Sequence, residues 1–208
     1  MIEVQTQHGV ARVHLHPVDR PRAALVLGHG AGGGVASRDL VAATEAALSL
    51  GVGVALVEQP YRVAGRRSPA PARQLDAAWI AVVDHLRAAE LRGLPLVVGG
   101  RSSGARVACR TAEATGAVAV LCLAFPLRPP RRSGSAPPQS RLPELDAVRV
   151  PMLVVQGVND AFGMPPAGPR RTVVQVPGDH SLRTDQGAVA SAVGEWLAAQ
   201  AARASSER

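Results

Sequence analysis

The sequence reads Leu94-Pro95-Leu96-Val97-Val98-Gly99-Gly100-Arg101-Ser102-Ser103-Gly104, an apolar segment that runs directly into a turn of small residues. Its second half has the pattern G-x-S-x-G, which places a serine on a tight, strained turn between a strand and a helix. Such a turn crowds the residues two before and two after the serine, so both must be small. Centring the pattern on Ser103 would put Arg101 in a crowded position, and Ser102 is therefore the predicted nucleophile.

A nucleophilic serine needs a base within hydrogen-bond reach and a third group that holds the base. After a G-x-S-x-G turn, the acid and then the histidine follow in chain order. The apolar run 152–156 leads to Asp160, and the run 172–176 leads to His180. His180 is the only one of six histidines that follows Asp160. Ser102, Asp160 and His180 are therefore the predicted catalytic residues.

Other interpretations of these residues stay open. Asp179 is a rival acid, although a carboxylate cannot easily reach the ring of the residue next to it, and Asp146 is a weaker rival because it precedes its strand. A glycine-rich turn with an exposed Ser102, and a surface histidine at His180, would give the same sequence without catalysis.

An earlier apolar run ends in Gly28-His29-Gly30-Ala31-Gly32-Gly33-Gly34. In one interpretation this loop supplies one backbone N–H of an oxyanion hole, and Ser103 supplies the other. Ala31 is the predicted donor of the loop, and Gly30 is the next choice. His29 is then a structural residue that bonds within the loop.

In a rival interpretation, Gly28-x-Gly30-x-x-Gly33 is a dinucleotide-binding fingerprint. The loop follows a predicted strand and precedes a predicted helix, and Glu58 ends the next strand, where an acid could bind a ribose. This interpretation leaves the serine, the acid and the histidine above unexplained. It is therefore the less favoured of the two.

Six short apolar runs rich in Val and Leu are typical of strands that are covered on both faces. They lie at residues 23–27, 53–57, 94–98, 118–123, 152–156 and 172–176. Helical patterns lie over 40–48, ended by Gly51, over 75–86, ended by Gly93, over 107–109, ended near Gly116, and over 189–197. The alternation predicts an α/β fold whose mostly parallel central sheet carries helices on both faces, after an antiparallel hairpin at 2–6 and 10–15. Ligands bind beyond the carboxyl ends of the strands in such sheets.

Composition limits the classes of partner. The formal net charge is +7, but the chain has no Lys and its Arg residues are scattered without aromatic side chains between them, so we expect no nucleic-acid partner. The two cysteines lie in apolar stretches and are read as buried hydrophobes, with no disulfide or metal site. No cofactor is expected.

The N-terminus has no apolar signal region, and no apolar run reaches the ~18 residues of a membrane span. We therefore expect no membrane association and a cytoplasmic location. A single domain is predicted over residues 1–200, followed by a frayed polar tail at 201–208. The sequence gives no indication of the oligomeric state.

With these pieces in place, the chain resembles the α/β-hydrolases over nearly its whole length. It is similar to the small dienelactone-hydrolase-like proteins and to the testis-expressed, hydrolase-like group with its bacterial relatives. The matching motifs are Gly28-His29-Gly30-Ala31-Gly32-Gly33, Pro60-Tyr61-Arg62, Gly99-Gly100-Arg101-Ser102, Phe125-Pro126-Leu127, Gly157-Val158-Asn159-Asp160 and Gly178-Asp179-His180-Ser181.

The resemblance implies an α/β-hydrolase fold with an eight-strand-like sheet, here trimmed at its edges, and no large cap domain. True dienelactone hydrolases use a Cys nucleophile where this chain has Ser102, so lactone cleavage does not transfer directly. Some members of the testis-expressed-like group are parts of larger assemblies. The alternative to an enzyme is therefore a non-catalytic interaction protein on the same fold.

We expect cleavage of a small carboxylic ester, thioester or lactone through an acyl-enzyme on Ser102. The irregular segments 58–73 and 126–143 follow strands and are predicted to shape the substrate pocket. The predicted substrate contacts are Gly30, Tyr61, Arg62, Phe125 and Arg128. The two arginines among them would favour an acidic acyl group.

Overall fold

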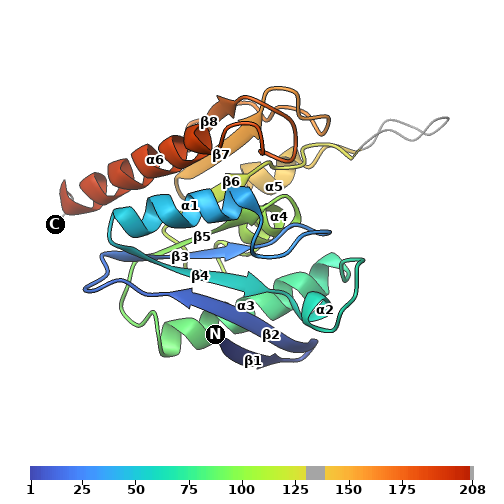
Figure 1. The fold of residues 1–208 in the computed structure, drawn as a ribbon, viewed down its shortest axis with the longest axis vertical. Coiled ribbons are helices and arrows are strands. Elements are labelled where there is room, and N and C mark those ends of the chain that lie inside the picture. Colours follow the sequence, from blue (N-terminus) through green and yellow to red (C-terminus); the bar gives the residue numbers. More distant parts are fainter. Residues whose placement is uncertain (130–138, 207–208) are drawn as a thin grey trace.

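The computed structural model describes residues 1–129 and 139–206 and builds them around one eight-stranded sheet (Figure 1). Its strand order is β1-β2-β4-β3-β5-β6-β7-β8. The strands are β1 (Ile2–Thr6), β2 (Gly9–His16), β3 (Ala23–Gly28), β4 (Val52–Glu58), β5 (Leu96–Arg101), β6 (Ala119–Leu123), β7 (Met152–Gly157) and β8 (Arg171–Val176). The β1–β2 and β2–β4 pairs are antiparallel, and the remaining pairs are parallel.

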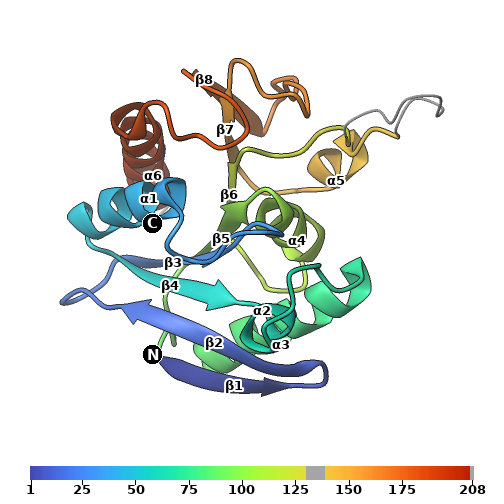
Figure 2. The same ribbon diagram turned by 45° about the vertical axis from the view of Figure 1, so that its right-hand side comes forward.

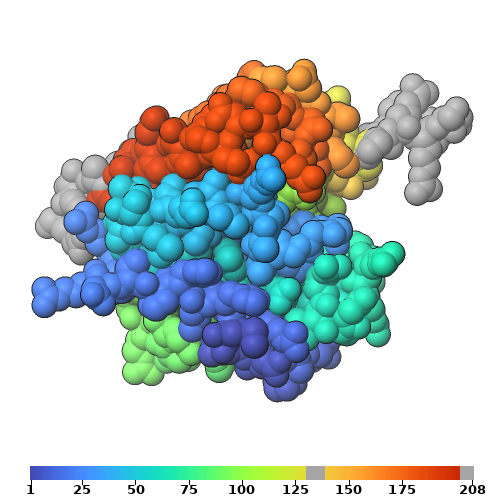
Figure 3. Space-filling model, viewed as in Figure 1, coloured from blue at the N-terminus to red at the C-terminus, as the bar shows by residue number. Residues whose placement is uncertain are grey.

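Helices cover both faces of the sheet (Figure 2). Helices α1 (Arg38–Ser49) and α6 (Gln186–Ser206) pack on one face, and α3 (Ala72–Ala88), α4 (Ser103–Thr111) and α5 (Leu142–Asp146) pack on the other. The short helix α2 (Pro60–Val63) follows β4. In the space-filling view, the chain from β8 into α6 lies directly against α1 (Figure 3).

Strand β3 shows why the layers form. Leu25 and Leu27 belong to the apolar cluster under α1 and α6, whereas Ala24 and Val26 belong to the cluster under α3 and α4. Successive side chains of a strand point to opposite faces, so a continuous apolar run needs cover on both sides. The predicted α/β fold with its antiparallel hairpin is confirmed.

Several details of the sequence prediction are wrong. The sheet is not trimmed, because all eight strands are present. Strand β8 is covered only in part: it is the edge strand, Thr172 and Gln175 are exposed, and Val173 and Val174 are half-buried against the clusters on the two faces. Helix α3 ends at Ala88 rather than at Gly93, because a further turn, with the Leu91 N–H bonded to the Leu86 carbonyl at 2.8 Å, separates them.

Two predicted segments reach the limits of the described chain. Helix α6 continues to Ser206 and so enters the segment predicted as a frayed tail, of which residues 207–208 lie outside the description. Residues 130–138, in the middle of the predicted rim segment 126–143, also lie outside it. Within the described ranges, none of the helices has the length and apolar character to span a bilayer.

The turn between β5 and α4 depends on a very close approach to the end of β3. A Cβ atom at Gly104 would lie 2.3 Å from the Gly28 carbonyl oxygen, and one at Gly100 would lie 2.5 Å from it. Both distances are shorter than any real Cβ contact. The crowding expected on either side of Ser102 is therefore present, and the backbone of β3 causes it.

We predict that Gly104→Ala destabilises the protein by about 1–3 kcal/mol, because the added methyl group pushes α4 away from β3. Urea unfolding followed by circular dichroism measures this change. Gly34→Ala is the matched control, because a Cβ there meets no atom within 4 Å. Equal stability of the two variants would contradict the prediction.

Candidate active site

Three loops at the carboxyl edge of the sheet bring a serine, a histidine and an aspartate together. Ser102 follows β5, Asp160 follows β7 and His180 follows β8. Nε2 of His180 lies 2.9 Å from Oγ of Ser102, and Nδ1 of His180 lies 2.8 Å from Oδ2 of Asp160. With the ring proton on Nδ1, the imidazole donates to the carboxylate and accepts the serine hydroxyl proton, which is the arrangement that activates a nucleophile.

The backbone at Ser102 is strained. Its φ of 51° and ψ of −106° lie outside the regions that residues with a Cβ atom favour. The Ser102 N–H donates to the Leu123 carbonyl of β6 at 2.9 Å, and helix α4 begins at the next residue. The sheet therefore holds the sharp turn in place while the Ser102 side chain stays half-buried and within reach of His180.

Asp160 is fixed on both carboxylate oxygens. Its side chain is 1% exposed. Oδ1 accepts the backbone N–H of Phe162 at 2.8 Å, and Oδ2 accepts Nε2 of Gln156 at 2.7 Å in addition to the histidine. Gln156 is itself fully buried at the end of β7 and also donates to the carbonyls of Phe125 and Gly163, both at 3.0 Å.

Sequence reasoning missed Gln156 and a second neighbour of the site, Phe162. The Phe162 ring lies against the imidazole of His180, with ring centroids 4.2 Å apart and planes tilted by 35°. A buried glutamine in an otherwise apolar strand was the one available signal for Gln156. Phe162 carried no signal, because its contact depends on how the loops after β7 and β8 fold.

The rival acids do not reach the imidazole in this structure. Oδ1 of Asp179 accepts the Ser181 hydroxyl at 2.6 Å and its backbone N–H at 2.9 Å, and these bonds lower the pKa of that carboxyl. Asp146, whose side chain is 56% exposed, pairs with Arg171 at 3.0 Å. Each carboxylate thus has its own partner away from His180.

The glycine-rich loop is held by two aromatic side chains. Nδ1 of His29 lies 2.7 Å from the Gly30 carbonyl, and Nε2 accepts the backbone N–H of Gln59 at 3.1 Å. The Tyr61 hydroxyl donates to the Ala31 carbonyl at 2.9 Å. His29 is therefore bonded within the loop, and its neutral tautomer satisfies both ring nitrogens.

Neither the Ala31 N–H nor the Ser103 N–H donates a hydrogen bond to any described residue. Ser103 is the first residue of α4, where the helix leaves its initial N–H groups unpaired. Gly30 is buried, and Nη1 of Arg101 would lie 2.6 Å from a Cβ atom placed on it. The loop thus has a free N–H at Ala31, in addition to the free N–H of Ser103 at the start of α4.

The predicted substrate contacts differ in their surroundings. Phe125 is 0% exposed and belongs to the apolar cluster on the face of the sheet that α3 and α4 cover, so its side chain presents no open surface in this structure; its contact with substrate stays a prediction. The Tyr61 side chain is 5% exposed and supports the loop through its hydroxyl. Arg62 on α2 is half-exposed, and Arg128 is exposed and bonded through its backbone N–H to the Phe162 carbonyl at 2.8 Å.

The dinucleotide interpretation lacks the geometry that it needs. The fingerprint requires a helix that opens directly at the glycine loop and directs its N-terminus at a pyrophosphate. Here α1 begins at Arg38, after a loop that extends past Gly33. Oε2 of Glu58 is engaged by Nε2 of His14 at 3.1 Å.

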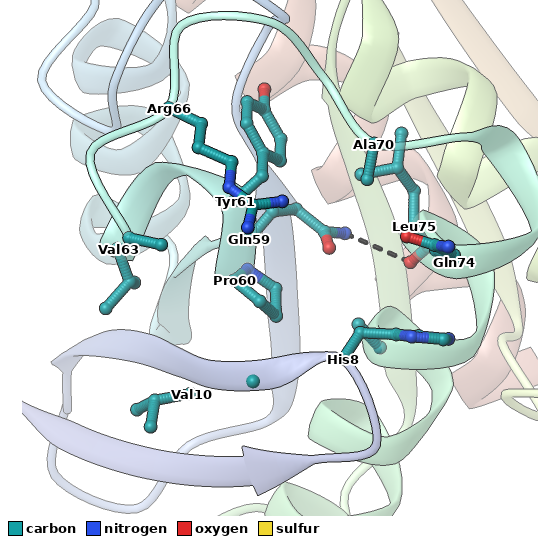
Figure 4. A pocket seen from close by; sticks show the side chains of 13 residues that line it. His8, Val10, Gln59, Pro60, Tyr61, Val63, Arg66, Ala70, Gln74 and Leu75 are labelled. Carbon is teal, nitrogen blue, oxygen red and sulfur yellow. Dashed lines mark hydrogen bonds between the residues drawn. The ribbon is translucent and has the colours of Figure 1, made fainter.

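A cavity of about 260 Å³ lies between the β1–β2 hairpin, α2 and α3. Its lining includes Gln59, Tyr61 and Leu75, and Nε2 of Gln59 donates to the Leu75 carbonyl at 3.2 Å (Figure 4). Ser102 and His180 do not line this cavity. It is therefore a separate hollow, and two of its lining residues, Gln59 and Tyr61, bond to the glycine-rich loop.

The two cysteines are free and buried, as predicted, with their Sγ atoms 3.5 Å apart. Among the described residues no cluster of three or more His, Cys, Asp or Glu side chains is placed to hold a metal ion.

A nucleophile turn after a central strand, followed along the chain by an acid and a histidine at the same sheet edge, defines the α/β-hydrolase class. A family model described as an alpha/beta hydrolase domain matches residues 21–205. The chain belongs to this family and is a hydrolase, as the resemblance implied. Among curated protein sequences, none matches the chain significantly.

Solved structures of the same fold include Est1E from Butyrivibrio proteoclasticus with ferulic acid bound, at 18% identity and a TM-score of 0.77 over 97% of this chain and 100% of that one. They also include XC6422 from Xanthomonas campestris, an α/β serine hydrolase without a lid, at 20% identity and a TM-score of 0.70 over 94% and 93%. A dienelactone hydrolase from Anabaena variabilis matches at 16% identity and a TM-score of 0.74, over 95% of both chains. These similarities establish the fold.

We predict that the protein loses stability as the pH falls below about 6.5, through His29. Burial lowers the pKa of His29 from its ordinary value of 6.5 more than the bond to the Gly30 carbonyl raises it, and the charge of Arg62 lowers it further. The unfolded chain thus binds this proton at a higher pH than the folded chain does. The stabilisation is complete above about pH 6.5 and declines below it.

Urea unfolding at a series of pH values measures the effect as the slope of stability against pH. His29→Gln should flatten this slope on the acid side. His85→Gln, at an exposed position on α3, should leave the slope as in the wild type. Identical slopes for wild type and His29→Gln would overturn the prediction.

Proposed function

We propose that the protein is a serine hydrolase that cleaves a small carboxylic ester, thioester or lactone through an acyl-enzyme on Ser102. One observation carries the proposal: Ser102 Oγ, the His180 ring and Asp160 form a continuous hydrogen-bonded chain, with links of 2.9 and 2.8 Å. A scaffold protein has no need for such a chain on a strained turn.

In the proposed mechanism, Nε2 of His180 takes the hydroxyl proton as Oγ of Ser102 attacks the carbonyl carbon. Asp160 holds the ring and stabilises its charged form. The proton then passes to the leaving alcohol or thiol, which leaves the acyl group on Ser102. Water loses a proton to His180 and attacks the acyl carbon. His180 then returns this proton to Oγ of Ser102 as the bond to the acyl group breaks, which releases the acid and restores the serine hydroxyl.

The backbone N–H groups of Ala31 and Ser103 are the proposed oxyanion donors. Both are free of other partners among the described residues, and Ser103 adds the positive end of the α4 dipole. Loss of one such donor typically lowers turnover by about 10²–10³-fold. The Tyr61 hydroxyl supports this role indirectly, because it fixes the Ala31 carbonyl and therefore the neighbouring peptide groups.

We further propose a short-chain or otherwise small substrate, because no cap domain stands over the described residues of the site. Est1E was solved with ferulic acid, and the Anabaena variabilis protein is a dienelactone hydrolase, so esters of small carboxylic acids and lactones are the substrates to screen first. Arg62 and Arg128 would favour an acidic acyl group. A single domain over 1–200 and a cytoplasmic location complete the proposal.

A fluorophosphonate probe tests the nucleophile. We predict covalent labelling of the wild type and none of Ser102→Ala, together with a loss of nitrophenyl-ester turnover of at least about 10⁴-fold in that variant. Ser191→Ala, which changes an exposed serine on α6, should label as the wild type does. Folded wild-type protein that does not label would favour the non-catalytic interaction protein instead.

The identity of the acid is tested separately. We predict that Asp160→Asn lowers kcat by about 10⁴-fold, because an amide at this position favours the wrong tautomer of the imidazole. Asp179→Asn keeps an oxygen for the Ser181 N–H and should leave kcat close to that of the wild type. A greater loss in Asp179→Asn than in Asp160→Asn would assign the acid to Asp179.

A further inference from the structure

Arg101, the residue before Ser102, contacts three segments that the site needs. Its Nε lies 3.0 Å from Oδ2 of Asp39, at the start of α1. Its Nη2 donates to the backbone carbonyl of His180 at 3.1 Å. Its Nη1 packs so closely on Gly30 that a Cβ atom there would lie 2.6 Å away. One guanidinium therefore links the turn at Ser102, the loop after β8 that carries His180 (the histidine loop) and the glycine-rich loop at Gly30.

The carboxylate that holds this guanidinium is itself firmly placed. The Asp39 side chain is 1% exposed, and its Oδ1 accepts the Leu40 N–H at 3.0 Å. Removal of one partner from a buried ion pair leaves an uncompensated charge, so both partners strongly favour the paired geometry. Only 19% of the Arg101 side chain is exposed, so water screens the pair little.

The histidine loop needs such an external contact. It follows β8, which lies at the edge of the sheet and has a neighbouring strand on one side only. Asp160 and Phe162 orient the imidazole ring, but they contact the side chain of His180. Arg101 bonds to the backbone carbonyl of His180, and this contact fixes the position of the backbone that carries the ring.

We propose that the Arg101–Asp39 pair is a positioning device, which holds the His180 backbone and the Gly30–Ala31 loop at a fixed distance from Ser102. This inference rests on the proposed serine hydrolase function. A planar guanidinium with several N–H groups can contact a carboxylate and a carbonyl at once, and a lysine ammonium has no such fork. Arg101 donates no proton to the reaction and acts only through its neighbours.

The chain offers a matched control on α4, the helix that follows Ser102. The Arg110 side chain is 20% exposed, close to the value for Arg101, and pairs with Asp76 at 2.6 Å and with Glu144 at 3.4 Å. It lies on α4 in contact with α3 and α5 and touches none of the proposed catalytic residues. Loss of Arg110 thus removes a comparable ion pair without disturbing the histidine loop.

The test compares Arg101→Ala, Arg101→Lys, Asp39→Asn and Arg110→Ala in nitrophenyl-ester hydrolysis and in the rate of fluorophosphonate labelling. We expect Arg101→Ala to lower kcat by about 10²-fold with KM changed far less, because misplacement of a catalytic group by ~1 Å costs about this much. The labelling rate should fall in parallel. Arg101→Lys and Asp39→Asn should also lower kcat, and Arg110→Ala should retain it.

Chemical rescue separates positioning from general loss of stability. Guanidinium chloride, at concentrations far below those that unfold the protein, should raise kcat of Arg101→Ala by filling the vacated space. It should not raise kcat of Arg110→Ala. Restored turnover in the first variant alone is a result that a purely structural arginine does not give.

Folded Arg101→Ala with the turnover of the wild type, or Arg101→Ala whose loss guanidinium does not relieve, would overturn the inference. If Arg101→Ala does not fold by circular dichroism, Arg101→Lys and Asp39→Asn decide, and wild-type kcat in both overturns it. In each of these cases the labelling of wild-type Ser102 still supports the hydrolase. Failure of the wild type itself to label would instead remove the proposed function.

Discussion

The contact between the end of β3 and the first turn of α4 is the constraint on which the rest of the site depends. The Gly28 carbonyl occupies the space that a Cβ atom would need at Gly100 or at Gly104. This approach brings α4 down onto the sheet and forces Ser102 into its strained conformation. Because Gly28 also begins the glycine-rich loop, the same contact fixes the spacing between the serine and the Ala31 N–H.

The two buried carboxylates at the site, Asp160 and Asp39, each have several partners that hold them in place. Asp160 accepts from a backbone N–H, a glutamine and a histidine, and Asp39 accepts from a backbone N–H and pairs with Arg101. A buried carboxylate without partners costs several kcal/mol, so these networks resist rearrangement. At the edge of the sheet, where apolar packing holds the loops less firmly than in the core, hydrogen bonds and an ion pair therefore hold the site in place.

Much of this arrangement could be predicted from the sequence, because local patterns and one topological rule suffice for it. Continuous apolar runs predicted the central strands, and the small residues around Ser102 predicted the turn. Loops after parallel strands meet at one edge, so Asp160 and His180 were expected near Ser102, and the structure brings these three side chains together. Their catalytic roles stay predictions.

The parts that could not be predicted depend on contacts between distant segments. An apolar side chain such as that of Phe125 fits a core as well as it fits a substrate pocket, and only the structure shows that Phe125 is fully buried. In the sequence, Arg101 indicated only that its side chain is too large for a crowded position beside Ser103. Its ion pair with Asp39, which lies 62 positions earlier in the chain, had no sequence signal. The end of α3 at Ala88 follows from the additional turn near Leu91, which no single glycine marks.

The position of β8 at the edge of the sheet connects these observations. The loop after an edge strand has a neighbouring strand on one side only. The proposed base on this loop nevertheless has to lie within hydrogen-bond distance of Ser102. The Val158 N–H donates to the Val176 carbonyl at 3.0 Å, and the Asn159 N–H donates to the Gly178 carbonyl at 2.9 Å. These bonds extend the β7–β8 pairing as far as Gly178, two residues before His180. Beyond that point the histidine depends on side chains from elsewhere: Asp160 and Phe162 on its ring, and Arg101 on its carbonyl. A base on a weakly paired loop is thus held by Arg101 at the end of β5 and by Asp160 and Phe162 in the loop after β7.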